Sequence, residues 1–362
     1  MYTRLTLLLF VLLNVAETFG QGAYTPQIAF KHLTIDNGLP QNTVFSIMQD
    51  RHGFMWFGTQ DGLCRYDGYE MKVFRHDRKK TYSLRNNYAT SLLVDHNQTL
   101  WVGTAGGGLN RYNEKNDHFT AYLHDPLNPR TLSDNRIHAL CEDYHGKIWV
   151  GTERGGLNLF DPQTGTAKIF MYSPQNPTSL PANRVYAIEK DIDKTLWIAT
   201  MGGGLCYFNP IDSSFVRVVF EADDKSLMKG QMNVTSTNSQ VEKPRQQTRR
   251  RLNAYSGGNR IVESNGVSAL YADKEGFLWI GTYGAGVIRL DVRTNRWERI
   301  FYEQKRSPMT ASSNDVFSIT ADHKGRVWIG LEGGGIRVYD RLSGEVKSCV
   351  HEPLNIPSLS DN

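Results

Sequence analysis

The 362-residue sequence predicts an all-β protein: a β-propeller built from four-stranded antiparallel blades. Six of its seven Trp residues occupy one position in a repeated motif, Trp-[Ile/Val/Phe]-Gly-Thr with small variations. An Asp lies six residues before each of these Trp residues and an Asn fourteen residues before, and successive Asn residues are 45 to 49 apart except for one spacing of 82. Each period also holds four short strand-like segments separated by turn residues. A horseshoe solenoid is the rival architecture, but four strands in each unit and a Trp in mid-unit favour the propeller.

The repeated positions are occupied as follows. The Trp residues are Trp56, Trp101, Trp149, Trp197, Trp279 and Trp328, and the Asp residues are Asp50, Asp95, Asp143, Asp191, Asp273 and Asp322. An Asp at the start of a turn accepts hydrogen bonds from backbone amides that follow it, so these carboxylates are expected to be structural. A catalytic group is needed once, whereas these recur in every unit.

The N-terminus reads as a signal peptide over residues 1–20 and not as part of the fold. Arg4 precedes a hydrophobic run at residues 5–15, and small and polar residues lead to a cleavage site after Gly20. The run is too short for a comfortable membrane span. We therefore expect export to the periplasm.

The propeller is expected over residues 28–362, beginning with an outermost blade strand at residues 29–36. Six complete blades follow, at about 42–77, 87–125, 135–172, 183–220, 265–303 and 314–351. The position four residues after each Asn is always Ser or Ala, which we interpret as a position near the axis, where blades converge. The last twelve residues repeat the loop that opens a blade and end on a further Asn. The expected design therefore has seven blades, six complete and one represented by the N-terminal strand, and its unpaired edges favour self-association.

The spacing of 82 places a flexible insertion at about residues 222–260. Residues 221–260 contain eight basic and four acidic residues, which accounts for the whole net charge of +4. A contact arm for an anionic glycan or a membrane surface is one interpretation, and a solvated loop that can be deleted without loss of the fold is the other. The remaining chain is neutral, so nucleic-acid binding is not expected.

The repeat resembles the two-component regulator propeller repeat: an Asn–Val strand, then Asp-x-x-Gly-x-x-Trp-[Ile/Val/Phe]-Gly-Thr, then Gly-Gly-Leu-x-x-Tyr/Phe-Asp. The sequence departs from this pattern only locally, with Ala199 in place of Gly and Leu331 in place of Thr. The resemblance implies the periplasmic sensor region of a bacterial hybrid two-component sensor kinase, many of which control polysaccharide use. Longer members continue with more blades, an immunoglobulin-like domain, a membrane helix and a histidine kinase, so such membrane-anchored signalling domains are expected partners beyond the C-terminus.

Other recurring features point to structure and not to chemistry. The glycine runs join two strands and suit turns with positive φ, not a phosphate cradle. The four Cys form no Cys-x-x-Cys pair and are expected to be buried apolar fillers. His76, His124 and His351 share one repeat position. No cofactor and no metal site are expected.

The candidate ligand site lies where the repeat varies, at the mouth formed by the turn after each Trp strand and the loop leading into each inner strand. Its candidate residues are Gln60, Asp61, Arg85, Arg136, Glu153, Arg154, Arg184, Tyr283 and Glu332. Carboxylates, guanidinium groups and an aromatic ring are suited to sugars or small acids. The leading hypothesis is a non-catalytic propeller that senses a glycan, a glycan breakdown product or a protein partner. The alternatives are a propeller glycoside hydrolase or lyase, with Glu153, Glu332 and Asp61 as its only carboxylate candidates, and a structural or assembly propeller.

Overall fold

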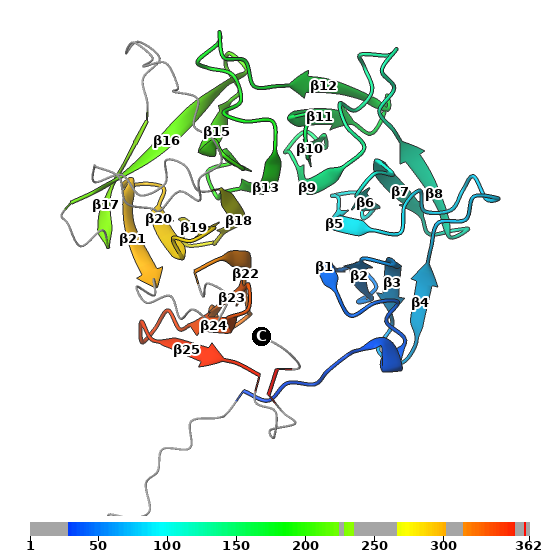
Figure 1. Ribbon diagram of the computed structural model, residues 1–362, viewed down its shortest axis with the longest axis horizontal. Coiled ribbons are helices and arrows are strands. Elements are labelled where there is room, and N and C mark those ends of the chain that lie inside the picture. The colour runs from blue at the N-terminus through cyan, green and yellow to red at the C-terminus, as the bar shows by residue number, and fades with distance from the viewer. Residues whose placement is uncertain (1–27, 224–227, 235–265, 302–313, 352–357, 360–362) are drawn as a thin grey trace, which may run out of the picture.

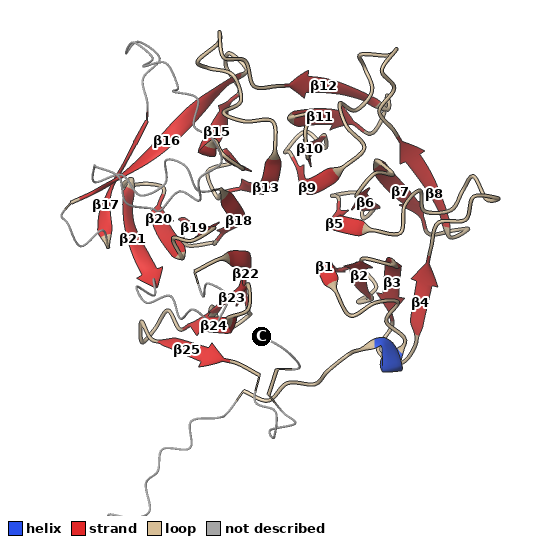
Figure 2. Ribbon diagram, in the orientation of Figure 1, coloured by secondary structure: helices blue, strands red, loops and turns tan. Residues whose placement is uncertain are grey.

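The chain folds into a ring of six antiparallel blades, as Figure 1 shows for the computed structural model; four blades are separate four-stranded sheets, and the other two are parts of one nine-stranded sheet. The structure describes residues 28–223, 228–234, 266–301, 314–351 and 358–359. Figure 2 shows that strands make up the described ring, with a single short 3-10 helix, η1 (Ile35–Asn37). None of the described residues belongs to a helix long and apolar enough to cross a membrane. The predicted all-β propeller is confirmed.

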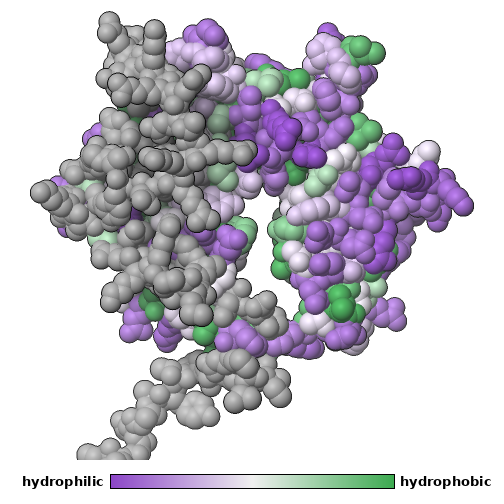
Figure 3. Space-filling model, viewed as in Figure 1, coloured by the Kyte–Doolittle hydropathy of each residue, from purple (hydrophilic) through white to green (hydrophobic). Residues whose placement is uncertain are grey.

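In every blade the chain runs from the innermost strand outward. The strands are β1 (Val44–Gln49), β2 (Met55–Thr59), β3 (Gly62–Tyr66) and β4 (Met71–Phe74) in blade 1; β5 (Ala89–Val94), β6 (Leu100–Thr104), β7 (Leu109–Asn113) and β8 (His118–Tyr122) in blade 2; β9 (Ile137–Glu142), β10 (Ile148–Thr152), β11 (Leu157–Asp161) and β12 (Thr166–Phe170) in blade 3; β13 (Val185–Lys190), β14 (Leu196–Thr200), β15 (Gly204–Asn209) and β16 (Ser214–Ala222) in blade 4; β18 (Val267–Ala272), β19 (Phe277–Thr282), β20 (Val287–Asp291) and β21 (Arg296–Phe301) in blade 5; and β22 (Val316–Ala321), β23 (Val327–Leu331), β24 (Gly335–Tyr339) and β25 (Val346–Cys349) in blade 6. The inner strands surround an opening along the axis of the ring (Figure 3).

The Asp and Trp of each repeat fasten the turn between the first two strands. Asp95 accepts a hydrogen bond from the Thr99 amide at 2.8 Å and a second from the Trp101 indole at 2.8 Å. The same indole bond forms in blades 1, 4, 5 and 6, at 2.7 to 3.0 Å. Because Trp101 is only 1% exposed, its N–H needs this acceptor.

The blades pack through the Trp of one blade and a Leu or Ile on the inner strand of the next. Trp56 shares a hydrophobic cluster with Leu92, and Trp279 shares one with Ile319. The small residue beside each of these Leu or Ile positions lies on the innermost strand, where space is limited. A Cβ built on Gly103 would lie 2.3 Å from the Ser91 hydroxyl and 2.6 Å from a methyl carbon of Ile137 in the next blade. The close packing of Ser91 against Gly103 therefore leaves room only for a small side chain at this position of the innermost strand, as the sequence predicted.

The Asn of each repeat ties its blade to the outer strand of the preceding one. Asn87 accepts a hydrogen bond from the His76 amide at 2.7 Å, and Asn135 and Asn183 accept the equivalent bonds in blades 3 and 4. Asn42 does the same for the amide of Ile35, at 2.9 Å. The N-terminal segment therefore ends where the outer strand of a preceding blade would end.

That N-terminal segment is not itself a strand. Residues 28–34 are assigned no ladder and residues 35–37 form η1, where the sequence predicted a strand at 29–36. A strand needs a neighbouring strand for its backbone hydrogen bonds, and among the described residues no strand lies beside this segment. Instead, His32 Nε2 makes a hydrogen bond with the carbonyl oxygen of Ser358, at 2.7 Å, and so joins the two ends of the described chain.

The ring is open between blades 6 and 1 (Figure 1). Ile47 of blade 1 is 56% exposed, whereas the equivalent Leu92 of blade 2 is 6% exposed. Trp328 of blade 6 is half-buried, whereas Trp279 of blade 5 is fully buried. In the described part of the chain, no neighbouring blade covers either residue, whereas their counterparts elsewhere in the ring are covered.

The insertion after blade 4 begins with an unexpected strand. β17 (Lys229–Val234) pairs with β16 on one side and with β21 on the other, so blades 4 and 5 merge into one nine-stranded sheet. Met232 of β17 is 7% exposed and packs with Phe220 and Trp297. The expectation of a wholly flexible insertion is therefore wrong for residues 229–234. In residues 229–234, polar residues alternate with Gly230 and Met232, but this pattern is too short to predict a strand from the sequence. Residues 235–265 lie outside the described residues.

The glycine runs have the structural role expected of them, and two of the four cysteines are buried as expected. Gly106 and Gly108 adopt φ of 129° and 64°, in the positive-φ region that glycine adopts without a steric cost. All four cysteines are free thiols, with Cys64 and Cys206 fully buried and Cys141 and Cys349 half-buried. His76 and His124 each bond through Nδ1 to a backbone carbonyl eight residues later.

Candidate functional site

Two loops of each blade meet at one end of the ring. The residue four positions after the repeat Trp donates its amide to the carbonyl of the residue that follows the repeat Asn. This bond joins Glu153 to Arg136 at 3.0 Å, Met201 to Arg184 at 2.9 Å and Tyr283 to Gly266 at 3.1 Å. The variable positions of neighbouring loops are therefore held side by side at the mouth of the ring.

Each inner strand contains a β-bulge close to this end of the ring. The ladder between the first and second strands shifts register at the same place in all six blades. A bulged residue leaves the ladder, so its side chain is re-aimed relative to its neighbours. The bulged residues are Phe45, Thr90, His138, Tyr186, Ser268 and Phe317. Phe45 and Phe317 are 44% and 57% exposed although they lie on innermost strands.

Glu153 is the centre of the best-formed polar group at this mouth. Its Oε2 accepts a hydrogen bond from His138 Nε2 at 2.5 Å, and its Oε1 forms an ion pair with the Arg184 guanidinium. The Glu153 side chain is only 14% exposed. Burial alone would raise the pKa of Glu153, but the hydrogen bond with His138 and the charge of Arg184 outweigh burial and lower that pKa. Glu153 is therefore held as a carboxylate.

Aromatic rings extend this group across two more blades. The His138 ring stacks on Tyr186, with centroids 4.8 Å apart and planes 8° apart. Tyr186 in turn meets Tyr283 edge to face at 6.4 Å. Burial, followed by the nearby Tyr186 and Glu332, raises the pKa of Tyr283 to about 12, so its hydroxyl remains a proton donor. We call Glu153, Arg184, His138, Tyr186 and Tyr283 the mouth cluster; it joins blades 3, 4 and 5.

The other predicted site residues do not join this cluster. Asp61 of blade 1 is engaged by Arg75 at 3.1 Å and by the Asn87 amide at 3.1 Å, which are contacts between elements of the scaffold. The remaining predicted residues are exposed and lie around the mouth on several blades: Gln60, Arg85, Arg136, Arg154 and Glu332. Of the nine predicted residues, the structure brings together Glu153, Arg184 and Tyr283.

Sequence reasoning missed His138 and Tyr186. Both stand three residues after the repeat Asn, a position occupied in order by Phe, Thr, His, Tyr, Ser and Phe. This position varies between apolar and polar residues from one repeat to the next, whereas the position that follows it is always Ser or Ala. Such variation is the signal that could have revealed His138 and Tyr186. Among the described residues, no group of three or more His, Cys, Asp or Glu side chains gathers as metal ligands would.

Similar proteins agree with the fold and the repeat. A curated histidine kinase from Formosa agariphila is 37% identical over 62 residues, which are 17% of this chain and 4% of that protein. The extracellular domain of a putative one-component system from B. thetaiotaomicron superposes with a TM-score of 0.60 at 21% identity, over 88% of this chain and 38% of that one. Virginiamycin B lyase from Staphylococcus aureus superposes with a TM-score of 0.54 at 13% identity, over 84% of this chain and 83% of that one. At such identities the two structures show a shared fold, and the chain spans well under half of the histidine kinase and of the one-component system domain.

The two component regulator propeller model matches the chain six times, at residues 38–61, 83–106, 131–154, 179–202, 262–284 and 310–333. Each match contains a repeat Trp and ends in the turn that follows it, and each falls in a different blade. The six matches are therefore the six blades of the ring, and this chain belongs to the two-component regulator propeller family.

Proposed function

We propose that this chain is the exported, non-catalytic sensing propeller of a two-component receptor, and that it binds a glycan or glycan breakdown product at the mouth cluster. The observation that carries the proposal is Glu153, fixed between His138 and Arg184 beside the stacked ring of Tyr186. The cluster offers a carboxylate as acceptor, a guanidinium as donor and aromatic faces for the apolar side of a sugar ring. Such a few convergent polar groups beside aromatic rings are typical of small-molecule sites.

Membership of the family supports the signalling role, and the histidine kinase relative indicates the kind of domain that would receive the signal. Because the mouth cluster draws on three blades, a ligand there would contact the inner strands β9 and β13 together. Binding could then change how neighbouring blades sit against each other, which is a change that a downstream domain can detect.

The hydrolase alternative is less well supported by the same geometry. A glycosidase needs one carboxyl group with a raised pKa to act as general acid. Both oxygens of Glu153 are already engaged, and its pKa is lowered. Asp61 is held by Arg75 and Asn87 in blade 1.

The test is binding of a glycan panel to the purified chain, measured by thermal shift and confirmed by isothermal titration calorimetry. For a glycan that binds, Glu153→Gln should weaken affinity about tenfold or more, because it removes the charge that orders both His138 and Arg184. Glu70→Gln is the matched control, since it makes the same substitution at an exposed position of blade 1 outside the candidate site.

Equal affinity of Glu153→Gln and the parent chain would refute the mouth cluster as the site. Turnover of a glycan that Glu153→Gln abolishes would instead establish the hydrolase alternative. No binding across the panel would favour a structural propeller.

A further inference from the structure

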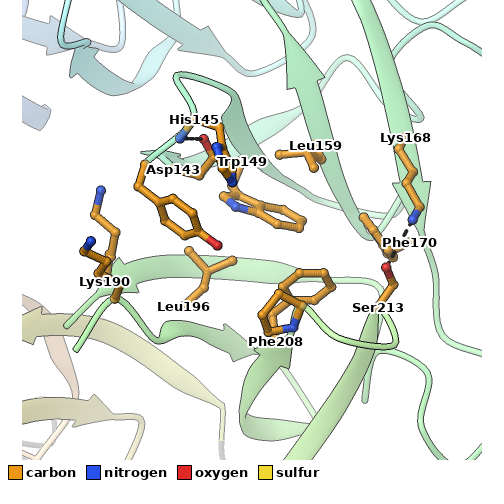
Figure 4. Close-up of a pocket in the computed structure, with 13 residues that line it drawn as sticks. Asp143, His145, Trp149, Leu159, Lys168, Phe170, Lys190, Leu196, Phe208 and Ser213 are labelled. Carbon is orange, nitrogen blue, oxygen red and sulfur yellow. Dashed lines mark hydrogen bonds between the residues drawn. The ribbon is translucent and has the colours of Figure 1, made fainter. Parts of the chain in front are cut away.

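A cavity of about 240 Å³ lies between blades 3 and 4, at the end of the inner strands opposite the mouth cluster. Figure 4 shows its lining side chains converging from both blades. The apolar lining comes from Trp149, Leu159 and Phe170 of blade 3 and from Leu196 and Phe208 of blade 4. Cavities for drug-sized ligands span about 300–1,000 Å³, so this one suits a smaller molecule carrying a single ring.

Three lysines surround this apolar lining. Lys168 lies over the Phe170 ring at 4.9 Å and donates to the Ser213 hydroxyl at 3.3 Å. Lys190 donates to a backbone carbonyl, that of Glu142, at 2.9 Å. Lys194 lies 5.7 Å from the Tyr144 ring centroid. Within the described part of the chain, none of the three ammonium groups has a carboxylate within ion-pair distance, and Asp143 is the one carboxylate in the cavity lining.

Trp149 adds a hydrogen-bond donor to the same cavity. In the other five blades the repeat indole donates to the repeat Asp. Asp143 instead accepts only from the amides of His145 and Lys147, at 2.7 and 2.9 Å, so in the described structure the Trp149 indole has no acceptor. The cavity therefore offers an indole N–H that the repeat uses internally everywhere else.

The equivalent cavity between blades 1 and 2 provides a comparison. It is similar in size, about 290 Å³, and also contains a repeat Trp and several cations. There, however, Glu114 pairs with Arg51 at 2.9 Å and with His52 at 2.7 Å, and the Trp56 indole donates to Asp50 at 2.7 Å. Uncompensated positive charge and an available indole donor thus distinguish the cavity between blades 3 and 4.

We propose that this cavity is a second binding site, for a small organic anion: a molecule with one ring and one carboxylate group. The ring would lie on Trp149, Phe170 and Phe208, and the carboxylate would be held by the Trp149 indole and a lysine at the edge of the cavity. A uronic acid and an aryl carboxylate share this chemistry. The site is separate from the mouth cluster, so it stands or falls independently of the sensing function proposed above.

The test uses the whole chain at low ionic strength with four probes: D-galacturonate, its neutral counterpart D-galactose, 4-hydroxybenzoate and inorganic sulfate. Binding is followed by calorimetry and by the indole N–H resonances in ¹⁵N–¹H spectra, with Trp149→Phe assigning the Trp149 signal. At least one of the two carboxylates should bind and shift that signal, and neutral galactose should not. Binding should weaken at high salt, because the lysines reach solvent.

The combined variant Lys168→Gln, Lys190→Gln and Lys194→Gln should weaken binding by about tenfold or more, since it removes all three lysines that line the cavity. Lys115→Gln, in the cavity between blades 1 and 2, is the matched control and should bind as the parent does. The proposal is overturned if neither carboxylate binds, if the lysine variant binds as well as the parent, or if sulfate alone binds as tightly as the ring-bearing carboxylates. The relative affinities of galacturonate and 4-hydroxybenzoate then decide between a sugar and an aryl acid.

Discussion

Replacement of Glu189 by Gln should stabilise the protein at alkaline pH and leave it unchanged at acidic pH. Glu189 stands opposite Trp197 on the inner strand of blade 4, between blades 4 and 5. The equivalent residues elsewhere are mostly apolar or aromatic: Met48, Leu93, Cys141, Tyr271 and Thr320. Its carboxyl group accepts a long hydrogen bond, 3.4 Å, from the Ala272 amide of the next blade. Burial raises the pKa of Glu189 from 4.5 to about 7 despite this bond and the nearby Lys190.

The direction of this change in stability depends on whether the folded or the unfolded chain binds the Glu189 proton more tightly. Between pH 4.5 and about 7 the folded chain keeps the Glu189 proton while the unfolded chain loses it, so the free energy of unfolding falls as pH rises through this window. At about 1.4 kcal/mol for each pKa unit, the loss is about 3 kcal/mol at most, and partial exposure of the residue brings the expected value to about 1–3 kcal/mol. Gln cannot ionise and should remove that loss.

The measurement is urea unfolding of both proteins by Trp fluorescence at pH 4.5, 6, 7 and 8. The two proteins should be equally stable at pH 4.5, and Glu189→Gln should be more stable by about 1–3 kcal/mol at pH 8. Glu70→Gln, at an exposed position of blade 1, should show no such divergence. If Glu189→Gln is less stable than the parent at pH 8, the carboxylate is ionised and well compensated, and the argument from burial is wrong.

Three further predictions concern the scaffold. Asp95→Ala should lower the free energy of unfolding by about 2–4 kcal/mol. The loss in Asp143→Ala should be smaller by about 1–2 kcal/mol, because the Asp95 carboxylate accepts an indole hydrogen bond and the Asp143 carboxylate does not. Equal losses in urea unfolding would contradict this difference. Met232→Ala should cost about 2–5 kcal/mol because its side chain is buried where β17 joins two blades, whereas deletion of residues 235–257 should cost far less; calorimetric melting compares the two variants. Ile47→Glu should reduce self-association in analytical ultracentrifugation, since Ile47 lies on the uncovered face of blade 1, and a parent chain that is already monomeric would argue against association through this face.

The fold could be predicted from the sequence because its physical causes are local and repeated. Each turn needs an Asp that can bond backbone amides, as Asp95 does, and each close approach of blades needs a very small residue, such as Gly103 in blade 2 or Ala199 in blade 4. Because six blades have the same requirements, the same residue types recur at regular spacing along the sequence. The sequence also directed attention to one end of the ring for a candidate site, because the residue types of the repeat vary there.

The sequence could not predict the contacts that residues far apart in the chain make between blades. Glu153 acquires its role from Arg184 in the next blade and from His138, whose direction depends on a β-bulge that no residue type announces. β17 exists because β16 and β21 both present free edges to it, which only the arrangement of blades 4 and 5 creates. The lysines between blades 3 and 4 look like solvated surface residues in the sequence, and it is the packing of two blades that brings them around one cavity. The propeller fold could thus be predicted from the sequence alone, because it depends on local hydrogen bonds and close packing that recur in each repeat. The candidate sites could not, because they depend on side chains that the tertiary structure brings together.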